Sequence, residues 1–189
     1  MGKNKKVLVL SCSVGKGHYS DTLGNEFIRG AQASGYETEK IHIGDHIPSG
    51  CFRCSSLASC ISGHLDHFSS RSYEAILKAD IIVITSSIAV ASPGGRFYRH
   101  TQQVCGSIYT FHEKNGREIR NKTVYLIVSS GVFYDEYNKI VMLDSFRKYI
   151  GYFDNVQEGG HLFAFGVPTA DTAKNNQAIQ QVYEMGKNA

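Results

Sequence analysis

Seven small, polar or basic residues stand close together near the start of the chain and could bind an anion. Glycine and serine leave backbone N–H groups accessible, and the hydroxyl, lysine and histidine side chains add further hydrogen-bond donors. At the start of a helix such a loop favours phosphate, because the aligned peptide dipoles place about half a positive charge there. The residues of this loop are Ser11, Ser13, Gly15, Lys16, Gly17, His18 and Ser20.

Two familiar phosphate-binding motifs are not present in this loop. The P-loop requires Ser or Thr after its lysine, but Gly17 follows Lys16. The dinucleotide fingerprint requires three spaced glycines, and this loop has Gly15 and Gly17. The ligand is therefore expected to be neither ATP nor a pyrophosphate held in those two ways, and an ordinary glycine-containing turn is the alternative interpretation.

The loop lies between a buried strand and an amphipathic helix. Residues 7–10 are continuously apolar, and Leu23, Phe27, Ile28 and Ala31 recur at helical spacing. Similar patterns predict further strands at 37–43, 81–87, 124–128 and 162–167, a loop at 113–122, and helices at 73–79, 97–111, 140–150 and 179–185. This alternation predicts an α/β fold, with a five-stranded parallel sheet of order 2-1-3-4-5 covered by helices on both faces.

Small polar residues follow the first, third and fourth of these strands. Ser86 and Ser87 end the third strand, and Ser130 and Gly131 follow the fourth. In the predicted strand order these ends are neighbours at the carboxyl edge of the sheet, where such folds bind ligands. The sequence therefore predicts one pocket that all three loops line.

The composition restricts the class of protein. With 189 residues, 42% of them hydrophobic, the chain is expected to form a single domain over residues 1–189. The formal net charge of +3 gives no indication of a nucleic-acid partner, and the apolar runs are too short for a membrane span. We expect a cytoplasmic protein whose five cysteines are thiols or ligands rather than disulfides.

Three stretches resemble the NADPH-dependent FMN reductases and related flavodoxin-like NAD(P)H oxidoreductases. They are SCSVGKGHYSDTL, ADIIVITSSIAVASPGGRFYRHTQQ and NNQAIQQVYEMGKNA. The resemblance implies a flavodoxin-like three-layer sandwich with FMN as cofactor and NADPH or NADH as cosubstrate. It also implies hydride transfer to the flavin and then to a flavin, quinone or other small acceptor, and a homodimer or homotetramer.

The resemblance also implies a set of FMN-binding residues but no catalytic acid or base. The flavin ring would lie along Ser86, Ser87, Ile88, Ala89 and Val90, and its pyrimidine side against Ser130 and Gly131. The residues expected around the phosphate are Ser11, Ser13, Lys16, His18, Ser20, Asp21 and Thr22, with Asp21 donating its N–H because its carboxylate would repel phosphate.

The chain departs from the family pattern at three positions. Val14, Gly15 and Ala89 stand where the family often has proline, arginine and an aromatic residue. A cation at the phosphate and a contact to the flavin ring are therefore missing, so weaker FMN binding or another ligand is the expected consequence. Phe133 or Tyr134 could cover the ring instead, although ordinary packing is the simpler interpretation for both.

A cysteine-containing segment resembles part of the iron–sulfur flavoproteins. Cys51 and Cys54 match the first two cluster ligands and Cys60 matches the last, but Leu57 stands where the third ligand should be. Since a [4Fe–4S] cluster normally requires four thiolates, no metal is predicted. Zinc with a nearby histidine is a less favoured alternative.

Two other classes of function remain as alternatives. A non-enzymatic flavodoxin-like electron carrier or sensor is disfavoured because such carriers are strongly acidic. The second alternative is a nucleotide-sugar glycosyltransferase, because the stretch SVGKGHYSDTL also resembles the opening of lipid glycosyltransferases. Those enzymes are about twice as long as this chain, and their later segments differ from it.

Overall fold

The computed structural model describes residues 5–12, 17–43, 67–89, 92–93, 119–132, 136–151, 153–166 and 176–189. The strands are β1 (Lys6–Ser11), β2 (Glu37–His42), β3 (Ile81–Ala89), β4 (Ser92–Pro93), β5 (Arg120–Ser130) and β6 (Asp154–Phe165). The helices are α1 (Tyr19–Ala33), α3 (His67–Lys78), α5 (Glu136–Ile150) and α6 (Asn176–Lys187).

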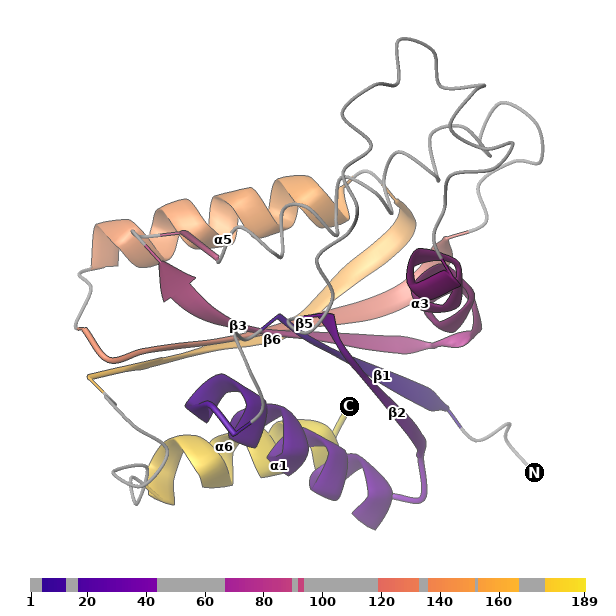
Figure 1. Cartoon of the computed structure of the whole chain (residues 1–189), viewed down its shortest axis with the longest axis horizontal. Helices are drawn as coiled ribbons and strands as arrows, with labels where there is room; N and C mark the ends of the chain where they lie inside the picture. Colours follow the sequence, from indigo (N-terminus) through magenta and orange to yellow (C-terminus); the bar gives the residue numbers. More distant parts are fainter. Residues whose placement is uncertain are drawn as a thin grey trace, which may run out of the picture.

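The sheet has the predicted strand order. Its five long strands are parallel and run β2-β1-β3-β5-β6, which is 2-1-3-4-5 when they are numbered along the chain. The short β4 adds an antiparallel pairing at the end of β3. Figure 1 shows α1 and α6 on one face of the sheet and α3 and α5 on the other. The predicted α/β three-layer sandwich is confirmed.

The continuous apolar runs explain why both faces of the sheet are covered. Val7 and Val9 of β1 belong to a core cluster with α1 and α6, whereas Leu8 and Leu10 belong to one with α3 and α5. Successive strand residues point to opposite faces, so each such run requires helices on both sides. Among the described residues, no helix is both long and apolar enough to cross a membrane.

The helix that follows the candidate anion-binding loop, α1, is terminated by a glycine. Gly35 has φ +80° and donates its N–H to Gln32 at 2.9 Å, and Tyr36 donates to Ala31 at 3.1 Å. These two bonds satisfy the last carbonyl groups of α1 in a Schellman motif, which requires a left-handed residue. The chain can then turn directly into β2.

Three local expectations were wrong or incomplete. Residues 120–122 belong to β5 rather than to the predicted loop, because the buried Lys122 pairs with Val156 instead of facing water. Strand β6 begins at Asp154 rather than near residue 162, since the alternating polar residues of this edge strand conceal its first half. Helix α5 begins at Glu136 rather than at residue 140, and Ile140 is 63% exposed whereas Met142 is buried. The helix predicted at 97–111 lies outside the described residues.

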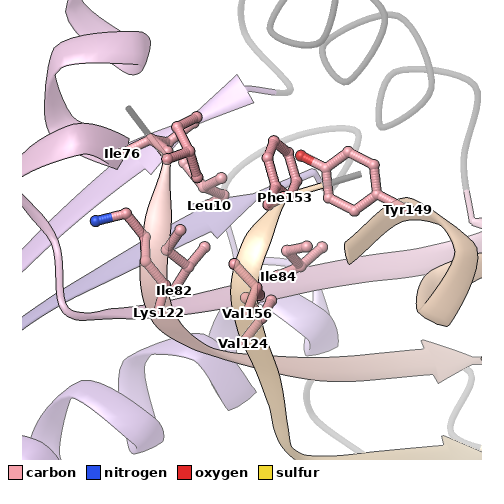
Figure 2. Close-up of a pocket in the computed structure, with 10 residues that line it drawn as sticks. Leu10, Ile76, Ile82, Ile84, Lys122, Val124, Tyr149, Phe153 and Val156 are labelled. Atoms are coloured by element: carbon pink, nitrogen blue, oxygen red, sulfur yellow. The ribbon is translucent and has the colours of Figure 1, made fainter. Parts of the chain in front are cut away.

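Two hollows in the structure lie away from the predicted site. An apolar cavity of about 10 Å³ under α3 and α5 is drawn in Figure 2, where the amino group of Lys122 points away from the other lining side chains. This volume holds at most one water molecule. An open groove of about 850 Å³ lies between β6 and α6, and no residue predicted to bind FMN lines it.

Candidate functional site

The ends of β1, β3 and β5 lie side by side at the carboxyl edge of the sheet. Ser11, the last residue of β1, is in register with Thr85 of β3, which in turn is in register with Ile127 of β5. Beyond that level β3 continues to Ala89 and β5 to Ser130, with Ser87 opposite Ser129. The three small-residue segments therefore converge, as predicted from the strand order.

The start of α1 carries backbone donors at the same edge. His18 is the N-cap residue, has an extended conformation and makes no capping hydrogen bond with its side chain. Its carbonyl oxygen accepts from the N–H groups of Asp21 at 2.9 Å and Thr22 at 3.0 Å. The positive end of the helix dipole is thus next to the end of β1, where an anion is favoured.

The carboxylate of Asp21 has a different role from the backbone role expected for this residue. It is buried, accepts a hydrogen bond from Ser11 Oγ at 2.9 Å and another from the Gly17 N–H at 3.3 Å. Lys40 Nζ lies 2.5 Å from the same carboxylate. The N–H group of Asp21 is occupied by the His18 carbonyl, so the expected contribution of Asp21 as a free backbone donor does not match this geometry.

These contacts determine the charge of Asp21. Burial raises the pKa of a carboxyl group, because it removes water from the charged form. Here the hydrogen bonds from Lys40, Ser11 and Gly17, together with the lysine charge, outweigh burial and hold the pKa of Asp21 below its usual value. The side chain is therefore an anion at neutral pH, and Lys40 compensates its charge.

At the ends of β3 and β5 the serine hydroxyls hold the backbone in place. Ser86 Oγ donates to the Ser87 carbonyl at 3.0 Å, and Ser130 Oγ accepts from the Val132 N–H at 3.0 Å. Ser86 and Ser130 are buried, whereas Gly131 and Val132 are exposed. The backbone of Gly131 and Val132, just after β5, is therefore accessible from the space beyond the sheet.

Several predicted residues cannot be placed. Ser13, Lys16, Val90 and the departures Val14 and Gly15 lie outside the described residues, as do Phe133, Tyr134, Cys51, Cys54 and Cys60. Ile88 and Ala89 belong to the last residues of β3. Over the described ranges, His, Cys, Asp and Glu side chains form no group of three or more that could hold a metal ion.

The sequence did not indicate Lys40 as a part of this site. It lies on β2 opposite Val9 of β1, and reaches α1. The alternation of residues 37–43 showed that every second side chain shares a face, which was the available signal. The alternation does not say which side chains of this strand, the odd-numbered or the even-numbered ones, face α1. That depends on the register between β1 and β2.

The donors present suit a phosphate ester. A helix N-terminus and nearby hydroxyls lie at this edge, and the negative charge of the Asp21 carboxylate beside them is compensated by Lys40. The buried hydroxyls of Tyr19 and Thr85, the first residue of α1 and a residue level with Ser11, have no hydrogen-bond partner among the described residues. A doubly wound sheet with such groups at its carboxyl edge is a flavodoxin-like fold, and folds of this kind bind their ligands at that edge.

The comparison with protein families identifies the class more closely. The model of the NADPH-dependent FMN reductase family matches residues 5–135, and the chain belongs to this family. It is therefore an oxidoreductase with FMN as cofactor and a nicotinamide nucleotide as cosubstrate. No curated protein sequence matches the chain significantly.

Solved structures share the fold at low sequence identity. An NAD(P)H:quinone oxidoreductase from Methanothermobacter marburgensis has a TM-score of 0.73 at 15% identity, covering 98% of this chain and 96% of that one. An azoreductase from Bacillus anthracis str. Sterne has a TM-score of 0.69 at 10% identity, covering 98% and 100%. An FMN-dependent NADH-azoreductase from Bacillus anthracis str. Ames Ancestor, in complex with FMN, has a TM-score of 0.63 at 11% identity, covering 97% and 96%.

Proposed function

We propose that this enzyme transfers hydride equivalents from NADPH or NADH to a flavin, a quinone or another small acceptor, with FMN held at the carboxyl ends of β1, β3 and β5. The observation that carries the proposal is the alignment of Ser11, Thr85 and Ile127, which brings three small-residue segments and the start of α1 to one edge. The structural neighbours described as quinone oxidoreductase, azoreductase and flavone reductase support an acceptor of this kind.

The chain's own residues would bind and orient the cofactor. The phosphate would be held by Ser13, Lys16, His18 and Ser20, because Ser11 Oγ donates to Asp21 and both donors of Thr22 contact the His18 carbonyl. The ring would be held by the backbone of residues 86–90 and by Ser130 and Gly131. When bound, FMN supplies the redox chemistry by accepting hydride from a nicotinamide and passing electrons to the acceptor. The protein's part is to hold the two reactants close together and to direct N–H dipoles at the flavin edge.

A charge placed at the start of α1 tests the position of the phosphate. His18→Glu adds a carboxylate at the exposed N-cap, a position where acidic residues suit the helix. A phosphate about 6 Å away would be repelled by about 0.7–2.8 kcal/mol at effective dielectric constants of about 80 to 20, so FMN affinity should fall by about 3- to 100-fold. Gln181→Glu, an exposed position of α6, makes a similar change in charge away from the site and should leave FMN affinity unchanged.

Activity is tested with the purified protein reconstituted with FMN. We expect oxidation of NADPH or NADH that depends on an added flavin or quinone. A protein that binds FMN but oxidises neither nucleotide with any acceptor would contradict the proposal and favour the electron-carrier alternative. A protein that does not bind FMN would contradict the placement of the site.

We also propose a homodimer or homotetramer. Large apolar side chains are exposed at the start of α5 and just before it: Val132 is 63%, Tyr137 72% and Ile140 63% exposed. Contact with a second copy would remove this apolar surface from water. Light scattering after size-exclusion chromatography should show more than one chain per particle, and Ile140→Lys should shift the protein toward the monomer.

A further inference from the structure

One carboxylate binds both ends of the loop between β1 and α1. Ser11 Oγ, at the end of β1, donates to Asp21 Oδ1 at 2.9 Å, and the N–H of Gly17 donates to Asp21 Oδ2 at 3.3 Å. Residues 12–16 lie between these two donors in the sequence. The two hydrogen bonds therefore fix the distance between the ends of the loop expected to hold phosphate.

The contact at Gly17 also fixes an unusual backbone conformation. Gly17 has φ +85°, in the left-handed region, where residues with a side chain are strained. In that conformation its N–H reaches the carboxylate four residues later rather than a ligand. The carboxylate therefore contacts the backbone where the described chain resumes after residues 13–16.

Lys40 provides the matching positive charge. Its Nζ lies 2.5 Å from Asp21 Oδ1 and also donates to the Asp21 carbonyl at 3.3 Å and to Asn25 Oδ1 at 2.7 Å. His42 Nε2 is 3.6 Å from the same carboxylate oxygen. An uncompensated carboxylate at this depth would oppose a phosphate ligand, whereas the pair with Lys40 leaves the base of the loop close to neutral.

From this geometry we infer that Asp21 is a positioning residue, with Lys40 as its counter-ion, that holds the β1–α1 loop in the form that selects a phosphorylated flavin over its unphosphorylated form. The inference rests on the proposed FMN site. It assigns to the side chain of Asp21 the role of holding the loop and to the start of α1 the role of binding phosphate.

The test compares FMN with riboflavin, which has the same ring system but no phosphate. Dissociation constants for both are measured by flavin fluorescence for the wild-type protein and for Asp21→Asn, Lys40→Met and Ser11→Ala. Loss of a hydrogen bond to a charged group should weaken FMN binding by about tenfold or more in Asp21→Asn and Lys40→Met, and less in Ser11→Ala. Riboflavin affinity should change by less than about twofold, because riboflavin carries no phosphate for this loop to bind.

An ion pair at the other end of the same two strands, where β1 and β2 begin, serves as a control. Lys6 Nζ on β1 lies 3.0 Å from Glu39 and 3.3 Å from Glu37, both on β2. Lys6→Met therefore breaks a β1–β2 ion pair far along the strands from Ser11, and the affinities for both flavins should stay unchanged.

The outcomes separate this inference from the proposed function. Equal loss of FMN and riboflavin affinity, or no loss of either, in a folded Asp21→Asn or Lys40→Met protein overturns the inference alone. A wild-type protein that binds neither flavin overturns the proposed function and the inference with it. If Asp21→Asn does not fold by circular dichroism, Lys40→Met and Ser11→Ala decide the question.

Discussion

Helices α1 and α6 touch backbone to backbone at two glycines, and a methyl group at either should destabilise the protein. A Cβ added to Gly30 of α1 would lie 2.1 Å from the carbonyl oxygen of Tyr183 and 2.9 Å from the backbone nitrogen of Lys187. A Cβ added to Gly186 of α6 would lie 2.2 Å from the carbonyl oxygen of Phe27. Because the atoms met are backbone, no side chain can turn away, and the helices must move apart.

The size of the effect follows from two opposing contributions. In a helix interior alanine is favoured over glycine by about 1 kcal/mol. Overpacking of a well-packed contact costs about 1–3 kcal/mol and occasionally more. Since the closest approach at Gly30 is 2.1 Å, more than 1 Å below ordinary contact, we expect an overpacking cost of about 3 kcal/mol or more, and therefore a net loss of about 2 kcal/mol or more for Gly30→Ala. For a chain of this size that lowers Tm by about 4–8 °C or more.

The assay is urea and thermal unfolding followed by circular dichroism for Gly30→Ala, Gly186→Ala and a matched control. Gly151, just after α5, is the control because its added Cβ would come no closer than 3.2 Å to the Arg147 carbonyl oxygen. Gly151→Ala should change stability by less than about 1 kcal/mol. Gly30→Ala or Gly186→Ala as stable as the wild type would refute the argument, since helix propensity alone would then decide the outcome.

Three further predictions follow from buried polar groups. Lys122→Met should lower the free energy of unfolding by about 1–3 kcal/mol in urea titrations, because Lys122 Nζ donates to the carbonyl groups of Leu77 and Ala79 at the end of α3; an unchanged midpoint would argue against this role. The pKa of Asp21 lies below its usual value in the folded protein, so its ionised carboxylate stabilises the fold above about pH 4. This stabilisation is lost as the pH falls through the pKa that Asp21 has in the folded protein. Asp21→Asn should therefore make the free energy of unfolding less dependent on pH on the acid side. Burial raises the pKa of the Cys12 thiol to about 12, so iodoacetamide at pH 8 should label it at least about 100-fold more slowly in folded than in unfolded protein, measured by peptide mass spectrometry, and rapid labelling of the folded protein would contradict its burial.

Much of the fold follows from local patterns in the sequence. Residues 7–10, 81–84 and 124–128 are apolar without interruption, and each of these runs is followed by small polar residues. An uninterrupted run of this length must be covered on both faces, which favours a parallel sheet between helices. The strand order and the convergence of three serine-containing ends could therefore be predicted, and β6 was only partly predicted because an edge strand alternates with polar residues.

The tertiary structure alone decided which polar groups meet. Asp21 was expected to act through its N–H group, because its carboxylate would repel a phosphate. The register of β1 and β2 places Lys40 beside it, and the close approach of α1 and α6 was likewise invisible in the isolated glycines. Hydrophobic periodicity is a property of neighbouring residues, whereas strand register and helix packing depend on residues far apart in the chain. The sequence therefore indicated the edge of the sheet where the site is proposed, and the packing of distant segments determined which charges meet there.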